Sequence, residues 1–395
     1  MNSLHKPSSR WMSISILLLL TALCITALWK FAVATSLGKD DFIGYWSAVY
    51  QIHRNHNPYD PKEMMDVQQT LVHSGLDFVV MSWNPPTLSV FLLPLAWLSF
   101  DAARSTWLVI NVILLLAANL MLARLYLPPG GRPLLGFCLL VLLFPQVLIT
   151  LTMGQVTLLV LLGLVSSMIL IRQGHWFWAG AALILTSVKP QIAFLAVPYL
   201  LIYMAYRRKW QGWLGLLVSG AACVVILFVF RPLWVADFLG LTSIAPTNWA
   251  TPTLGGLLSF WGVTEAARYL IVVFLPLAWV LARSQSVIRL ESAVALLTVI
   301  TVPTTFFGWG YDQSVLLIPI AQLLGWLLLS SNRWVKAVVI LGILGSFALI
   351  WIQRIMRVNE VNYFWVPIFW GVVYCIGCAV NKAALSTRAV VAHAE

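Results

Sequence analysis

Charge is scarce in this sequence of 395 residues. Only 9% of the residues are charged and 61% are hydrophobic, and just 13 are Asp or Glu. Such a composition lies far outside the range of a soluble globular domain. The apolar runs are long and continuous rather than alternating, which excludes the strands of a membrane β-barrel. The sequence therefore predicts an all-α polytopic membrane protein.

Cysteine is also rare, and each of the five cysteines lies inside an apolar run. No disulfide framework is indicated, and we interpret Cys375-x-x-Cys378 as small-residue packing within a span rather than a redox or metal motif. His53, His56 and His73 lack the regular spacing of metal ligands. The sequence has no nucleotide-binding glycine loop, Walker motif or Ser-His-Asp arrangement. We therefore expect no metal and no cofactor.

The net charge of +11 does not indicate a nucleic-acid partner. The basic residues stand between apolar runs, as membrane topology anchors do, and are not interleaved with aromatic residues. Many of the 20 Trp residues fall at the ends of these runs, which is typical of the aromatic belts at membrane interfaces.

About twelve membrane spans are predicted, because a spanning helix needs roughly 20 mostly apolar residues. Their ranges are 12–34, 84–99, 105–126, 134–152, 155–171, 176–206, 212–230, 265–284, 291–308, 314–330, 335–353 and 363–380. Lys189-Pro190 interrupts the long stretch 176–206, which indicates a broken helix or two half-spans. We interpret residues 1–395 as a single integral-membrane domain with both termini in the cytoplasm.

With this topology two polar loops, 35–83 and 231–264, face outside. The first holds six of the 13 acidic residues of the chain, which makes it the place to look for chemistry. These are Asp40, Asp41, Asp60, Glu63, Asp66 and Asp77. Within the loops, segments 60–73 and 235–245 are predicted to be short helices at the membrane surface, and Asp60 is suited to cap the first of them.

Asp40 and Asp41 stand at the outer end of the first predicted span. A carboxylate at a membrane interface, beside apolar walls, can act as a general base. The alternative is a pair of solvated loop acids. The aromatic residues that follow, Phe42, Tyr45 and Trp46, favour a site. Because successive side chains point in different directions, we expect one of the two carboxylates to face the reaction.

Lys189 is a cation deep within an apolar stretch. Ionisable residues at such depth are functional candidates, and a lysine beside a helix break suits a lipid-borne phosphate. The alternative is that the side chain reaches the interface. Gln155, between two apolar runs, either bridges helices or faces a polar cavity. Asp312 is either a second site carboxylate or a helix cap. Arg231, Arg354 and Arg357 either neutralise a phosphate leaving group or meet lipid headgroups.

Several short motifs together resemble those of a known enzyme family. In chain order they are Asp40-Asp41-Phe42-Ile43-Gly44-Tyr45, Asn57-Pro58-Tyr59-Asp60, Pro85-Pro86, Pro94-Leu95-Ala96, Gly154-Gln155, Lys189-Pro190-Gln191, Pro252-Thr253-Leu254-Gly255-Gly256 and Tyr311-Asp312. Their order and spacing over about residues 35–320 resemble glycosyltransferase family 87, integral-membrane enzymes of the GT-C type that include mannosyltransferases of cell-envelope glycolipid synthesis.

The resemblance implies a GT-C-like bundle and transfer of mannose, or another hexose or pentose, from a polyprenyl-phosphate donor. The acceptor would be a glycolipid or glycan at the outer (periplasmic) face of the bacterial cytoplasmic membrane. It also implies Asp41 as the base, with Asp40 as its neighbour, and inversion at the anomeric carbon. The residues expected to bind substrate are Tyr45, Asn57, Tyr59, Gln155, Lys189, Tyr311, Asp312 and Arg231.

Two other classes of function remain open from the sequence. A lipid or solute transporter or flippase would line its path with Lys189 and Asp312. We see no paired inverted repeat, however, and the acids gather in an outer loop rather than at mid-membrane. A non-catalytic scaffold for envelope assembly would tolerate substitution of both Asp41 and Lys189.

Overall fold

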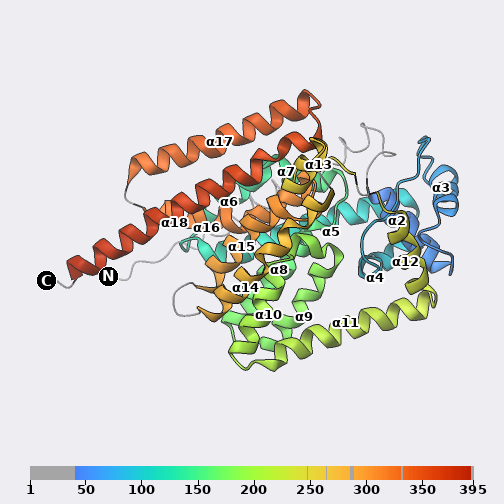
Figure 1. The fold of residues 1–395 in the computed structure, drawn as a ribbon, viewed down its shortest axis with the longest axis horizontal. Helices are drawn as coiled ribbons and strands as arrows, with labels where there is room; N and C mark the ends of the chain where they lie inside the picture. Colours follow the sequence, from blue (N-terminus) through green and yellow to red (C-terminus); the bar gives the residue numbers. More distant parts are fainter. Residues whose placement is uncertain (1–40, 247, 264, 285–288, 331, 393–395) are drawn as a thin grey trace, which may run out of the picture. The chain divides into compact units, whose positions relative to one another are not determined.

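A computed structural model describes residues 41–246, 248–263, 265–284, 289–330 and 332–392 (Figure 1). Within these ranges the regular structure is helical, as predicted, with no strand. The chain divides into two compact units. Unit 1 comprises residues up to Asn119, Gln146–Pro190 and Arg207–Thr247, and unit 2 comprises Leu120–Pro145, Gln191–Tyr206 and the chain from Asn248 onward.

Unit 1 contains ten helices and most of an eleventh among the residues that the structure describes. They are α2 (Phe42–His53), α3 (Pro61–Thr70), α4 (Thr87–Leu92), the 3-10 helix η1 (Leu93–Trp97), most of α5 (Phe100–Tyr126), α7 (Pro145–Thr152), α8 (Thr157–Arg172), α9 (Trp176–Ala182), η2 (Leu183–Val188), α11 (Trp210–Phe230) and α12 (Trp234–Ile244).

Unit 2 holds the end of α5 and the remaining helices. They are α6 (Gly131–Leu143), η3 (Pro190–Ala193), α10 (Ala196–Tyr206), α13 (Leu254–Phe260), η4 (Glu265–Phe274), α14 (Leu275–Arg283), α15 (Leu290–Thr304), η5 (Gly310–Leu316), α16 (Leu317–Leu329), α17 (Arg333–Ile355), η6 (Glu360–Tyr363) and α18 (Trp365–Ala392).

Part of the predicted polar loop 35–83 is a buried helix instead. Helix α2 begins directly after Asp41, and ten of its twelve residues are buried. This helix within the loop was not predicted, because the acids around the segment hide an apolar core from Phe42 to Val49. Gly44 allows α2 to lie against the chain at Val80 and Met81, since a Cβ at this position would stand 2.7 Å from the Val80 carbonyl oxygen.

Helices α3 and α12 confirm the two short helices predicted at 60–73 and 235–245. Asp60 is the N-cap of α3, as predicted, because its carboxylate accepts hydrogen bonds from the backbone N–H groups of Lys62 and Glu63 at 2.8 and 3.2 Å.

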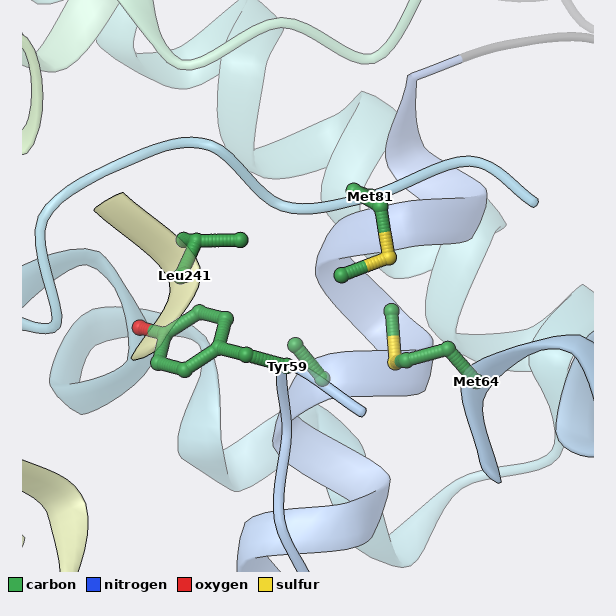
Figure 2. Close-up of a cluster of buried hydrophobic side chains, with 5 residues drawn as sticks. Tyr59, Met64, Met81 and Leu241 are labelled. Atoms are coloured by element: carbon green, nitrogen blue, oxygen red, sulfur yellow. The ribbon is translucent and has the colours of Figure 1, made fainter. Parts of the chain in front are cut away.

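A hydrophobic cluster joins α2, α3, the 76–83 segment and α12 (Figure 2). The thioethers of Met64 and Met81 point toward each other, and the Tyr59 ring lies beside Leu241. Ala48 of α2 completes the cluster. Flexible methionine side chains suit such an irregular junction.

The stretch 176–206 is broken at the predicted place. Helix α9 passes into η2, Lys189 leaves helical geometry with φ −145° and ψ 71°, and η3 begins at Pro190. Proline cannot donate a backbone hydrogen bond, so it kinks or breaks an α-helix at an interior position.

Helices α9 and α11 cross in close contact at glycine residues of both helices. A Cβ at Gly180 would lie 1.7 Å from the Gly212 carbonyl oxygen, and one at Gly215 would lie 1.9 Å from the Phe177 carbonyl oxygen. Small residues at a crossing of apolar helices allow such close backbone approach.

Five helices among the described residues are long and apolar enough to span a membrane. They are Phe100–Tyr126, Trp210–Phe230, Ala266–Arg283, Gly310–Leu329 and Glu360–Val380, and the pair Gly131–Leu143 and Pro145–Thr152 makes a sixth if it is one broken span. The predicted count of about twelve is therefore not confirmed. Predicted spans such as 84–99 and 176–206 are represented by shorter apolar helices, and the predicted span 12–34 lies outside the described residues.

Candidate functional site

Three segments of unit 1 that lie far apart in the sequence bring their polar side chains together at Gln155. The Gln155 amide nitrogen donates to Asp41 Oδ2 through a short hydrogen bond. Its carbonyl oxygen accepts from Lys189 Nζ at 2.8 Å and from the Tyr45 hydroxyl at 3.1 Å. Gln155 is 0% exposed and Lys189 is 4% exposed. The side chain of Gln155 thus links a carboxylate to an ammonium group.

The orientation of the Gln155 amide follows from these neighbours. A carboxylate accepts hydrogen bonds and an ammonium group donates them, so the amide must turn its NH₂ toward Asp41 and its oxygen toward Lys189. The reverse orientation would place two donors together at Lys189 and two acceptors together at Asp41. The arrangement is therefore chemically self-consistent and fixes one carboxylate oxygen of Asp41.

Asp41 and Tyr45 reach Gln155 from the same face of α2, because residues four apart are neighbours on a helix. Asp41 is the N-cap residue, yet its side chain makes no capping hydrogen bond. A negative charge at this end of the helix is favoured by the helix dipole. The predicted neighbour Asp40 lies outside the described residues.

The turn that carries Gln155 is held from two sides. Trp107 Nε1 donates to the Gly154 carbonyl at 2.8 Å, and Arg104 donates to the Thr152 carbonyl. Gly154 has a φ of +62°, and a Cβ there would meet Phe42 at 2.7 Å, so this position requires glycine. The buried guanidinium of Arg104 also faces the Phe42 ring at 5.7 Å.

The helix break positions Lys189. The Asn84 side chain donates to the Val188 carbonyl at 2.9 Å, and the Thr87 hydroxyl donates to the Ser187 carbonyl at 3.1 Å. These bonds satisfy backbone acceptors where regular helix ends, which a buried break requires. The predicted alternative for Lys189, reaching an interface, does not fit a side chain that is buried and bonded to Gln155.

The other predicted site residues of unit 1 form contacts that do not involve Gln155. Arg231 forms an ion pair with Asp237 at 2.6 Å and donates to the Asn55 carbonyl at 2.6 Å. The hydrogen bond to Asp237 raises the pKa of Arg231. Burial, followed by the charge of Asp237, raises the pKa of the Tyr59 phenol well above its usual value. Asn57 accepts from the Tyr59 backbone N–H at 2.9 Å, which shapes the turn before α3.

In unit 2, the Asp312 side chain bonds to the backbone just before its own helix. Its carboxylate accepts from the Trp309 N–H at 3.0 Å, three residues back, and it is 1% exposed. This contact favours the helix-terminus alternative predicted from the sequence, although Asp312 occupies the third position of η5 rather than the N-cap. The Tyr311 ring stacks on that of Trp309 with centroids 6.4 Å apart.

Unit 2 also contains a buried cation that the sequence did not single out. Arg268 donates to the Trp249 carbonyl at 2.6 Å and to the Thr251 hydroxyl at 3.3 Å, and it faces the Phe307 ring at 4.8 Å. Gly255 gives η4 room, since a Cβ there would lie 2.5 Å from the Arg268 Cα. The Gly/Thr-rich segment after residue 247 thus packs around Arg268.

Among the residues that the structure describes, no group of three His, Cys, Asp or Glu side chains could hold a metal ion.

Comparison with known proteins gives one family. The model of glycosyltransferase family 87 matches residues 83–308, which include Gln155, Lys189 and Arg231. Asp41 and Tyr45 precede the matched range, and Asp312 follows it. Neither the search of curated proteins nor the search of solved structures finds a match.

Proposed function

This chain belongs to glycosyltransferase family 87, and from that premise we propose the reaction that this multi-pass membrane glycosyltransferase performs. It moves mannose, or another hexose or pentose, from a polyprenyl-phosphate donor to a glycolipid or glycan acceptor. The fold is of the GT-C type, and transfer takes place at the outer (periplasmic) face of the bacterial cytoplasmic membrane.

The observation that carries the proposal is the contact of Gln155 with both Asp41 and Lys189. In the proposed step Asp41 takes the proton of an acceptor hydroxyl, and the oxygen forms a bond to the anomeric carbon. The bond from that carbon to the phosphate oxygen breaks, and its electron pair leaves with the polyprenyl phosphate. A single displacement of this kind inverts the anomeric centre.

Each of the three residues has a distinct role in this step. Asp41 is the general base. A positioned carboxylate that removes a proton typically raises the reaction rate by a factor of about 10² to 10⁴. Lys189 stabilises the charge that develops on the departing phosphate. Gln155 is a positioning residue: it orients Asp41 and holds the Lys189 ammonium group nearby. Because the ammonium group supplies the positive charge, the proposal requires no metal and no cofactor.

The test uses the purified protein in lipid with radiolabelled polyprenyl-phosphate hexoses and pentoses and a membrane lipid extract. We expect label to move into a new lipid or glycan with the parent protein and not with Asp41→Asn. Asp66→Asn is the matched control, because Asp66 is an exposed acid on α3. Near-normal transfer by Asp41→Asn would overturn its role as base.

The same assay separates the transporter alternative. A transporter would move a labelled lipid across the bilayer without covalent change. A glycosyltransferase would instead convert the acceptor into a labelled product that is heavier than the acceptor by one sugar residue. Membership of the glycosyltransferase family favours the second outcome.

A further inference from the structure

A concave surface of unit 1 extends along α2 to the end opposite Asp41. This open groove has a volume of about 440 Å³. Its walls come from the end of α2, from Leu71 after α3, and from the 96–100 turn between η1 and α5. We call it the Trp97 groove. Helix α2 has 12 residues, which at about 1.5 Å of rise per residue separates its two ends by about 18 Å. The wall of the groove begins at Trp46, directly after Tyr45, and reaches the far end of α2, and none of the residues that bond to Gln155 lines it.

Aromatic side chains with polar neighbours line the Trp97 groove. The rings of Trp97 and His53 lie 4.6 Å apart, and Trp46 stacks on Tyr50 at 5.1 Å. The Arg54 guanidinium lies 4.4 Å from the Tyr50 ring centroid. Trp97 itself is 57% exposed. Flat aromatic faces beside hydroxyl, imidazole and guanidinium groups match a ligand with an apolar face and a polar edge.

The helix terminus at the groove disfavours an anionic ligand, although the charged side chain on the groove wall, Arg54, is basic. Arg54 is the C-cap residue of α2, so it stands at the negative end of the helix dipole. Phosphate sites in proteins typically use the opposite end of a helix or several basic side chains. Here one guanidinium stacks on an aromatic ring and partly offsets that dipole. A neutral polyhydroxylated ligand avoids this unfavourable field.

The groove also adjoins a membrane-spanning helix. The edge of the Trp97 ring contacts Phe230, the last residue of α11, with centroids 6.3 Å apart. Exposed apolar side chains such as Leu217, Val225 and Val229 run along α11 toward this end. A lipid chain lying against α11 would therefore place its headgroup at the Trp97 groove.

From these observations we infer that the Trp97 groove binds a neutral sugar of the glycolipid acceptor, remote from the hydroxyl that reacts. The identity of the ligand as acceptor rests on the proposed function. The separation from Asp41 means that the groove selects acceptors with more than one sugar unit. Trp97 is then a specificity-determining residue and not a catalytic one.

The experiment measures binding directly, so it does not depend on transfer. The purified protein in lipid nanodiscs is titrated with free linear trisaccharides of glucose, mannose or arabinose. Saturation-transfer NMR measures the binding of each trisaccharide. We expect at least one trisaccharide to bind and Trp97→Ala to weaken that binding at least tenfold. The matched control is Trp261→Ala, which removes a tryptophan of comparable exposure (67%) from unit 2. Asp41→Asn should bind as the parent does.

Three outcomes would overturn the proposal: no trisaccharide binds, Trp97→Ala binds as tightly as the parent, or inorganic phosphate displaces the sugar. The last result would make the groove an anion site. Sugar binding that depends on Trp97, with no transfer from any donor, would count against the proposed function alone. Transfer that depends on Asp41, with binding indifferent to Trp97, would count against the groove alone.

Discussion

Two carboxylates, the half-buried Asp41 of unit 1 and the buried Asp312 of unit 2, are used in different ways. Asp41 in unit 1 accepts from Gln155, a residue 114 positions away, and the same amide accepts from Lys189. Asp312 in unit 2 accepts from the N–H of Trp309, only three residues back. The first contact joins distant segments around a cation, whereas the second satisfies the backbone at the start of a short helix. From the sequence, Asp41 was predicted as the base, and Asp312 as either a second site carboxylate or a helix cap.

The buried cations show the same contrast. Lys189 donates to a side-chain amide that also holds a carboxylate. Arg268 donates to a backbone carbonyl and a threonine hydroxyl within its own packing region. A buried charge that satisfies nearby backbone mainly stabilises the fold. A buried charge held by another functional side chain is expected to serve the reaction, which the following substitutions test.

The largest expected effect is that of Asp41→Asn. Loss of the general base should lower kcat by a factor of about 10² to 10⁴, with little change in thermal stability. Asp312→Asn is the counterpart. Weakening its bond to the Trp309 N–H should cost about 1–3 kcal/mol of stability, while turnover per folded molecule stays near that of the parent. The measurements are kcat in the transfer assay and thermal unfolding in detergent. Equal losses of kcat in both variants would break the comparison.

Lys189→Met should have the next largest effect. Removing one group that stabilises a developing oxyanion typically lowers kcat by about 10² to 10³, and Met keeps a similar volume in the buried position. Arg268→Met should instead lower the unfolding temperature, because it leaves the Trp249 carbonyl without its donor. Lys62→Met on the exposed face of α3 is the matched control and should change neither quantity. Full activity in Lys189→Met would remove the ammonium group from the mechanism.

Gln155→Leu tests the link between the two charges. A positioning residue should lower kcat by about tenfold to a hundredfold while KM for the donor changes less. It should also shift the pH profile of kcat, because Asp41 loses a hydrogen-bond donor, and Gln155→Asn should restore part of the rate.

The counterpart is Gln322→Leu in unit 2. Gln322 donates to Ser292 and accepts from the Tyr374 hydroxyl at 2.6 Å. Its loss should therefore affect stability alone. An unchanged pH profile in Gln155→Leu would make Gln155 a purely structural residue.

How much of this arrangement the sequence predicts depends on the range of the interaction. The Asp60 cap, helices α3 and α12 and the break at Lys189-Pro190 follow from local chemistry, and the structure confirms them. Helix α2 was predicted as part of a loop, because acids on either side mask its apolar run. The supports from Arg104 and Trp107 to the 152–154 turn bridge about 48 residues, and no local pattern encodes them.

The predicted number of spans is not confirmed for a related reason. Hydropathy averages over a window, so apolar runs that contain Pro94 or Pro303 are predicted as continuous spans. The structure divides or shortens them into helices of 10–17 residues. At about 1.5 Å per residue, an 11-residue helix covers roughly half of a bilayer core of about 30 Å.

The smallest expected effect is that of Arg231→Gln, which sharpens the comparison within unit 1 itself. Arg231 was predicted to bind substrate, yet it pairs with Asp237 six residues on and with the Asn55 carbonyl. If a charged residue paired only with nearby residues serves stability and not the reaction, Arg231→Gln should cost about 1–3 kcal/mol of stability. It should leave kcat and KM unchanged.

Asp237→Asn should cost a similar amount, and the double variant should cost less than the sum of the two, because both remove the same ion pair. Thermal unfolding of the four proteins measures this coupling. A rise in KM for the donor in Arg231→Gln, without one in Asp237→Asn, would return Arg231 to the substrate site. The contrast between locally paired charges and charges held by a site side chain would then fail within unit 1, since a locally paired cation would also serve the reaction.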